Sequence, residues 1–247
     1  MRRFSYLAAL IAVAAPTFAH AAVTMSFNAA APATGLDDQF NFLDDATVPG
    51  GSAPGGGTYN SQNYSDNAGP PGQTFRTPAG ANPYTLTSIS VKSVGDGGGG
   101  VFDAGQTWGL RVSSVSGTTL TPVNVVTNIA PAVGTLTNAV GWLTFSLSGG
   151  DAVALSPNAD YAFELYSSTG WFGIDATQGD GAYANGTGFN SGSGNRNFTD
   201  ATLGNLANHG YDRTFHVALQ AVPEPATALL GIVGFLGVHA ARRRRRL

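Results

Sequence analysis

Residues 84–92 read YTLTSISVK, and their apolar residues alternate with polar ones on either side of a single slip in phase. Tyr84 and Leu86 keep one phase, whereas Ile89 and Val91 keep the other. Alternation with one apolar face is typical of an antiparallel strand packed on a core. The slip predicts a β-bulge between Leu86 and Ile89, because a bulge inserts one extra residue into a strand.

Further segments alternate in the same way, so we expect an all-β protein. They are 107–115 (TWGLRVSSV), 142–148 (WLTFSLS), 160–168 (DYAFELYSS) and 213–221 (RTFHVALQA). No stretch between residues 22 and 222 keeps a helical period for three turns. Short strands separated by Gly, Asn, Asp and Pro predict one antiparallel two-sheet sandwich, jelly-roll-like in type, over residues 22–221.

Two segments break the alternation and are rich in glycine. Residues 49–72 and 178–197 are too polar to build a core, and we expect both to form long loops. The first could instead be a flexible linker that follows an N-terminal strand.

The N-terminal residues 1–21 have the three parts of a secretory signal peptide. A basic start at Arg2 and Arg3 precedes an apolar run over residues 6–15, and Ala19-His20-Ala21 is a small-x-small cleavage site. We expect cleavage after Ala21 and export by the general secretion machinery. The apolar run is too short for a first transmembrane helix.

The C-terminal residues 222–247, VPEPATALLGIVGFLGVHAARRRRRL, also have three parts. Prolines cannot extend a helix or donate to a sheet, so the folded domain should end at the Pro-Glu-Pro step. The apolar run 226–241 predicts a short C-terminal transmembrane helix. It is shorter than the ~20 residues of a full span, which suits a transient one. The terminal arginines favour the cytoplasmic side.

This order of motif, apolar run and basic cluster resembles the PEP-CTERM sorting signal of exported proteins from Gram-negative bacteria that make extracellular polysaccharide. The residues that carry the resemblance are Val222, Pro223, Glu224, Pro225, Arg242, Arg243, Arg244, Arg245 and Arg246. The resemblance implies insertion in the inner membrane, recognition by an exosortase and processing near the motif. The product would then reach the cell surface or the extracellular matrix. The alternative is an ordinary C-terminal membrane anchor after a proline-rich hinge.

More weakly, the strand series resembles the sandwich ectodomains that often precede this tail. The resembling stretches are GQTFRTP around Phe75, YTLTSISV, WLTFSLSG, LSPNADYAFEL, WFGID and YDRTFHVAL. Such ectodomains look like carbohydrate-binding folds, so the resemblance concerns the fold more than any activity.

Charge and cysteine content narrow the function classes. Between residues 22 and 222, five Lys and Arg residues face fourteen Asp and Glu residues, a net charge of about −9. Such a surface is a poor partner for nucleic acid, whereas neutral polymers and cations suit it better. The chain has no cysteine, which excludes disulfides, thiolate metal sites and cysteine nucleophiles.

Groups suited to catalysis are few, and we therefore expect no enzyme. The ectodomain has two histidines, His209 and His216. His216 lies between Phe215 and Val217, so it should point away from the core as a surface histidine. Glu164 lies in an equivalent position, which favours a solvated carboxylate over one member of a catalytic pair. A polysaccharide hydrolase remains the least favoured alternative.

Two kinds of ligand site are nevertheless candidates. Asp175 and Asp180 lie in a glycine-rich segment that could hold a structural calcium ion, although turn-forming aspartates are the ordinary interpretation. Trp142 and Trp171 could offer flat faces to sugars, although a sandwich tryptophan is more often in the core. The leading hypothesis is a structural or adhesive protein of the exopolysaccharide matrix or biofilm. The alternative is a carbohydrate-binding, lectin-like module, with or without a dependence on calcium.

Overall fold

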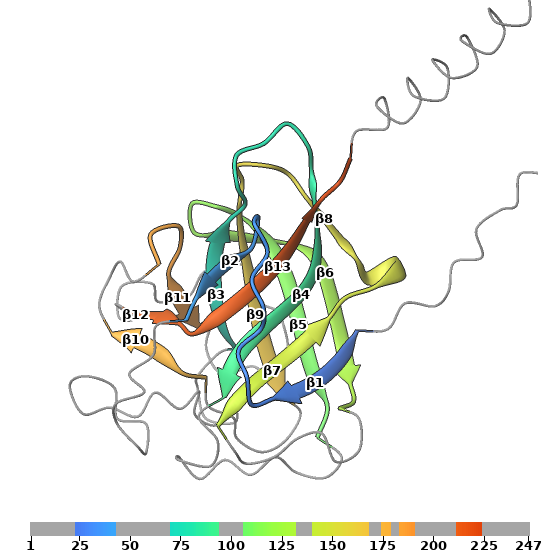
Figure 1. Ribbon diagram of the computed structural model, residues 1–247, viewed down its shortest axis with the longest axis vertical. Coiled ribbons are helices and arrows are strands. Elements are labelled where there is room, and N and C mark those ends of the chain that lie inside the picture. The colour runs from blue at the N-terminus through green and yellow to red at the C-terminus, as the bar shows by residue number, and fades with distance from the viewer. Residues whose placement is uncertain are drawn as a thin grey trace, which may run out of the picture.

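The computed structural model describes residues 23–42, 70–93, 106–131, 140–167, 174–178, 183–190 and 211–223. These residues form two antiparallel sheets with a core between them, so the expected all-β class is confirmed at this level (Figure 1). Within these ranges no helix is long and apolar enough to cross a membrane. The apolar run 226–241 lies outside the described residues.

The first sheet has six strands in the order β1-β7-β4-β13-β2, with β8 pairing beside β4. Its strands are β1 (Thr24–Asn28), β2 (Gln39–Asn41), β4 (Tyr84–Ser93), β7 (Gly141–Ser146), β8 (Val153–Leu155) and β13 (Phe215–Ala221). A short 3₁₀ turn, η1 (Gly149–Asp151), precedes β8. The first and last strands of the described chain thus belong to the same sheet.

The second sheet has five strands in the order β11-β3-β9-β5-β6. They are β3 (Pro71–Arg76), β5 (Trp108–Ser116), β6 (Thr119–Ile129), β9 (Asp160–Ser167) and β11 (Gly188–Asn190). A separate pair, β10 (Ala176–Gln178) with β12 (Tyr211–Arg213), lies at one end of the sandwich (Figure 1).

Both glycine-rich segments reach into strands, which corrects their predicted boundaries. Pro71 and Gly72 belong to β3, and residues 188–190 form β11 beside it. A side chain at Gly72 would overlap the Phe189 ring and the backbone of β9. Glycine is therefore a packing requirement here rather than a sign of a loop. Residues 49–69, 179–182 and 191–197 lie outside the described residues.

Each of the five segments that alternate in the sequence forms a strand, and their apolar faces meet in the core. Phe163 of the second sheet contacts Phe215 of the first, with ring centroids 5.8 Å apart. Trp108 and Phe145 are paired across the sheets in the same way at 6.1 Å. Burial of such rings is the main favourable contribution to folding.

The predicted bulge lies in β4, at Thr87. Ser88 pairs with Ala218 and Leu86 pairs with Leu219, which leaves Thr87 as the extra residue. Its carbonyl oxygen accepts a hydrogen bond from the Leu147 amide at 2.8 Å, so the unpaired group is satisfied. The bulge keeps Leu86 and Ile89 on the core side although their spacing is odd.

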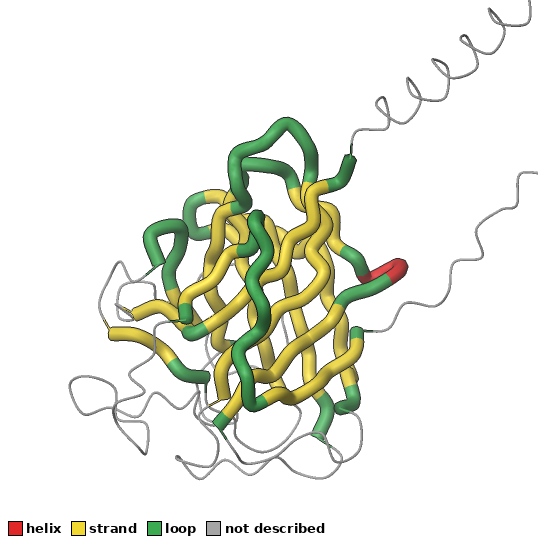
Figure 2. Tube along the Cα trace, in the orientation of Figure 1, coloured by secondary structure: helices red, strands yellow, loops and turns green. Residues whose placement is uncertain are grey.

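Residues 29–42, here called the strap, cross the outer face of the first sheet. The strap joins β1 at one edge of the sheet to β2 at the opposite edge, so its path must cover the strands between them (Figure 2). Leu36 on the strap is fully exposed, at 101%, whereas Asn41 at its end is buried. His216 and Trp142, on the outer face of this sheet, are only 2% and 5% exposed, so the strap forms a third layer that shields part of that face from solvent.

Candidate functional site

The second sheet carries an open cavity of about 370 Å³, which we call the polar groove. Its lining comes from β3, β9, the turn between β5 and β6, and residues 184–187. Small-molecule sites in proteins occupy roughly 300–1,000 Å³, so this volume suits a small ligand.

Arg76 and Asp160 form one side of the polar groove. The two residues are direct partners in the register of β3 and β9. Arg76 Nε and Nη2 donate to the two oxygens of Asp160, each at 2.7 Å, in a bidentate pair. The hydrogen bonds and the negative charge of Asp160 raise the pKa of Arg76 above its ordinary value. The side chains are 49% and 43% exposed, so both charged groups remain accessible to a ligand.

Thr74 and Thr187 form another part of the groove wall. The Thr74 amide donates to the Thr187 carbonyl at 2.9 Å, and the Thr187 amide donates to Thr74 Oγ1 at 2.7 Å. A side chain at Gly186 would overlap the Thr74 carbonyl oxygen, so only glycine permits this approach. The wall is consequently held in place before any ligand arrives.

Gly117, in the turn between β5 and β6, also lines the groove. Its φ of +60° is in the left-handed region, which glycine and asparagine adopt most readily. The space where its side chain would stand is empty to 4 Å. The groove is therefore open beside Gly117.

The outer face of the second sheet also holds a buried ion pair. Glu164 points away from the sandwich core, as its strand phase predicts, but the expectation of a solvated carboxylate is wrong. Its side chain is 0% exposed and forms a bidentate pair with Arg111, which is 1% exposed. The two residues face one another across β5 and β9, so neighbouring strands supply the two charges.

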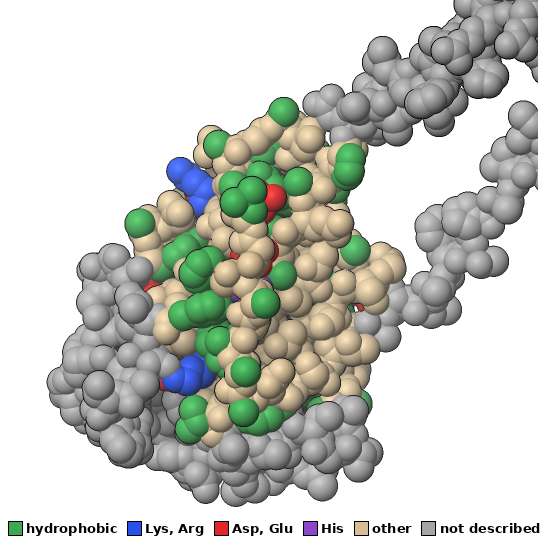
Figure 3. All heavy atoms as spheres, in the orientation of Figure 1, with side chains coloured by type: hydrophobic (Ala, Val, Ile, Leu, Met, Phe, Trp, Pro, Cys, Tyr) green, Lys and Arg blue, Asp and Glu red, His purple; other side chains and the backbone are tan. Residues whose placement is uncertain are grey.

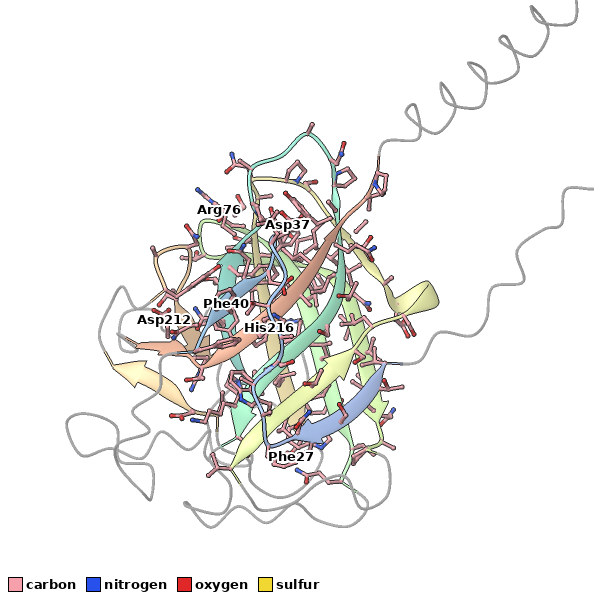
Figure 4. All side chains as sticks on the ribbon, viewed as in Figure 1. Phe27, Asp37, Phe40, Arg76, Asp212 and His216 are labelled. Atoms are coloured by element: carbon pink, nitrogen blue, oxygen red, sulfur yellow. The ribbon has the colours of Figure 1, made fainter. Side chains whose placement is uncertain are left out.

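His216 likewise points away from the core, yet it is not a surface histidine. It is 2% exposed because the strap covers it. Its Nε2 lies 2.8 Å from Asp38 Oδ2, and the rings of Phe40 and Phe42 lie beside it (Figure 4). No pattern in the sequence indicated that residues 29–42 would return over this strand.

The strap also covers Trp142, one of the two expected sugar platforms. Trp142 lies on the outer face, in agreement with its phase, but it is only 5% exposed. Its ring contacts Phe42 edge to face, with centroids 5.2 Å apart. The ring face is thus occupied by protein, and it offers no platform here. Trp171 lies outside the described residues.

The expected calcium residues are only half described. Asp175 Oδ2 lies 3.4 Å from the Lys92 ammonium, and Asp175 Oδ1 accepts a hydrogen bond from the Ala176 amide. Asp180 lies outside the described residues. Within the described part of the chain, no three His, Asp or Glu side chains are grouped closely enough to hold a metal ion. The calcium site therefore stays a prediction.

The expected sorting motif, Val222 to Pro225, begins just before the described chain ends at residue 223. β13 ends at Ala221, and the Val222 amide makes a last backbone hydrogen bond with the Pro83 carbonyl at 2.9 Å. Pro223 is exposed. The remaining signal residues Ala19, Ala21, Glu224, Pro225 and Arg242 to Arg246 lie outside the described residues.

The residues of the polar groove were not among the sequence candidates. Arg76 and Asp160 are 84 positions apart, and no pattern in the sequence indicated either of them as a ligand-binding residue. Figure 3, which views the other side of the sandwich, shows few charged side chains among the described residues of that face. The fold brings these two half-exposed, oppositely charged residues into one cavity, and the sequence alone does not show that they meet.

Fold and site together define an all-β protein of two antiparallel sheets with a small polar groove on one outer face. No protein-family model matches the chain. No curated protein and no solved structure matches it either.

Proposed function

We propose that this chain is an exported, non-enzymatic protein of the cell surface or extracellular matrix, with a structural or adhesive role in exopolysaccharide. The observation that carries the proposal is the order of Pro-Glu-Pro motif, apolar run and arginine cluster in residues 222–247. In this proposal an exosortase processes the chain near Val222 to Pro225, after the signal peptide has been removed at Ala21.

The end of the ordered sheet supports this interpretation. The last backbone hydrogen bond of the described chain comes from Val222, and Pro223 is already exposed. A membrane enzyme could therefore reach the motif without unfolding β13. Proline at this point also prevents the sheet from continuing into the motif.

The finer architecture belongs to the same proposal. We take the sandwich to be jelly-roll-like, because consecutive strands β3, β4 and β5 alternate between the two sheets. We also take residues 226–241 to form a short transmembrane helix that holds the precursor in the inner membrane, with the arginines on the cytoplasmic side.

Replacing Pro223, Glu224 and Pro225 with alanine in the exporting bacterium tests the sorting role. We expect the variant to accumulate as unprocessed precursor in the inner-membrane fraction, because the exosortase no longer recognises it. The matched control is Gln220→Ala, an exposed position just before the motif, which should be processed normally. Unchanged size and location of the triple variant would contradict the proposal.

The polar groove favours a second candidate function, a carbohydrate-binding module. Its lining groups include a guanidinium, a carboxylate and hydroxyl groups, which are the donors and acceptors that sugar hydroxyls need. Binding of the full-length protein, purified in detergent, to a glycan array tests this function. Adding and removing calcium would show whether the predicted ion contributes. Absence of saturable binding to any glycan would contradict it.

A further inference from the structure

We infer that the polar groove binds a neutral sugar unit through two adjacent hydroxyl groups, held by Arg76 and Asp160. The inference deepens the proposed carbohydrate-binding function and rests on it. It names a site different from the tryptophan platforms expected from the sequence.

Among the described residues, the Arg76–Asp160 pair has unused hydrogen-bonding capacity. Arginine has five N–H donors, and Asp160 uses two of them. Each carboxylate oxygen can accept more than one hydrogen bond, and Arg76 uses one on each. A donor and an acceptor therefore stand side by side at the mouth of the groove. Two neighbouring hydroxyls of a sugar match this arrangement, because each hydroxyl can both donate and accept.

The charges of the groove favour a neutral ligand. Arg76 and Asp160 compensate one another, so the pair as a whole carries no net charge. A uronate would have to compete with Asp160 for the guanidinium and would approach an ectodomain with a net charge of about −9. Both effects oppose an anionic sugar.

The volume and lining of the groove define the size of the ligand. About 370 Å³ lies near the lower end of the range for small-molecule sites, so we expect one or two sugar units to be bound. Thr74 and Thr187 supply a polar wall that is already fixed by hydrogen bonds. Val115 supplies an apolar surface for the C–H face of a ring. A fixed wall lowers the cost of ordering the site on binding.

The exposure of the ion pair makes the inference testable without unfolding the protein. Exposed ion pairs contribute little to stability, so Arg76→Met and Asp160→Asn should fold normally. Gly117→Asn offers an independent steric test. Asparagine tolerates the left-handed backbone, and its side chain would occupy open space next to a residue that lines the groove.

The experiment measures binding of neutral di- and trisaccharides, and of their uronate counterparts, to full-length protein by titration calorimetry. We expect Arg76→Met, Asp160→Asn and Gly117→Asn each to weaken binding of the neutral sugars about tenfold or more. Asp151→Asn, on η1 and outside the groove lining, should leave affinity unchanged. The uronates should bind more weakly than the neutral sugars.

Several results would overturn the inference, and they are distinct from failure of the proposed function. If glycans bind but the groove variants retain full affinity, the module function survives and the site is elsewhere. Tighter binding of uronates would refute a neutral ligand. If no glycan binds while the Pro-Glu-Pro variant still fails to be processed, the inference and the module function fall, whereas the sorting role stands.

Discussion

Glu164 and Arg111 face one another across β9 and β5 with side chains 0% and 1% exposed, although they lie on the outer face of their sheet. Removing both charges from water is costly, and their attraction together with hydrogen bonds offsets that cost. Loss of one partner leaves the other charge buried without its counter-ion. Glu164→Gln should therefore lower the free energy of unfolding by about 3 kcal/mol or more, measured by urea denaturation.

A double variant that removes both charges tests whether the cost of each single change comes from the charge that is left behind. Arg111→Met with Glu164→Leu should cost less than the sum of the single changes, because no unpaired charge remains. Asp160→Asn, in the exposed pair with Arg76, should leave the urea midpoint nearly unchanged. Equal and small effects of the buried and exposed changes would show that Glu164 is not buried as a charged pair.

The Asp38 carboxylate makes three interactions that hold the strap. Asp38 Oδ2 accepts from the Gly35 amide at 2.6 Å and lies 2.8 Å from His216 Nε2, and Oδ1 accepts from the Leu219 amide at 2.9 Å. Asp38→Ala removes all three interactions. We expect faster amide hydrogen exchange over residues 29–42, with β9 unaffected, because local opening of the strap becomes easier.

Asp37→Ala is the matched control for this change. Its carboxylate makes no hydrogen bond to any described residue, although it is the immediate neighbour of Asp38. Exchange in the strap should stay as in the wild type. If both variants, or neither, accelerate exchange, then Asp38 does not hold the strap through these bonds.

Much of the fold was readable in the sequence because alternation and turn residues are local signals. The phase slip around Thr87 predicted the bulge, and the phases of Glu164, His216 and Trp142 correctly placed them away from the core. Their burial was not readable. It depends on residues far along the chain, such as the strap over His216, and alternation carries no information about a third layer.

The polar groove was unreadable for a related reason. Its charged pair is joined only by the register of β3 and β9, and another part of its wall comes from residues near 186. Gly186 and Gly72 looked like loop residues in the sequence, whereas in the fold they permit close backbone approach. Composition alone does not distinguish these two uses of glycine.

Tyr183 should make the two-sheet domain less stable in alkali. Burial raises its pKa above the ordinary value, and its hydroxyl donates to Gln39 Oε1 at 2.9 Å. Since the folded pKa exceeds that of the unfolded chain, the stabilising contribution is complete below about pH 10 and declines as pH rises further. Urea midpoints should therefore fall above about pH 10, and Tyr183→Phe should flatten this decline.

A second tyrosine, Tyr166, should also contribute to the loss of stability in alkali. Burial also raises the pKa of Tyr166, so Tyr183→Phe should remove part of the alkaline decline and Tyr166→Phe another part. An identical pH profile for the wild type and Tyr183→Phe would show that the Tyr183 hydroxyl is not buried in solution.

Gly186→Ala tests the fixed wall of the polar groove. Its new methyl group would overlap the Thr74 carbonyl oxygen, which belongs to the backbone of β3 and cannot rotate away. Residues 184–187 must then move outward, and the hydrogen bonds between Thr74 and Thr187 weaken. We expect a loss of about 1–3 kcal/mol in the free energy of unfolding, together with weaker sugar binding.

Gly117→Asn supplies the contrast, because its side chain enters open space and the backbone remains acceptable. It should weaken sugar binding with little loss of stability, whereas Gly186→Ala should reduce both. Wild-type stability of Gly186→Ala would mean that residues 184–187 lie farther from β3 than the hydrogen bonds of Thr74 require. The groove would then lack the preformed wall on which tight binding of a small ligand depends.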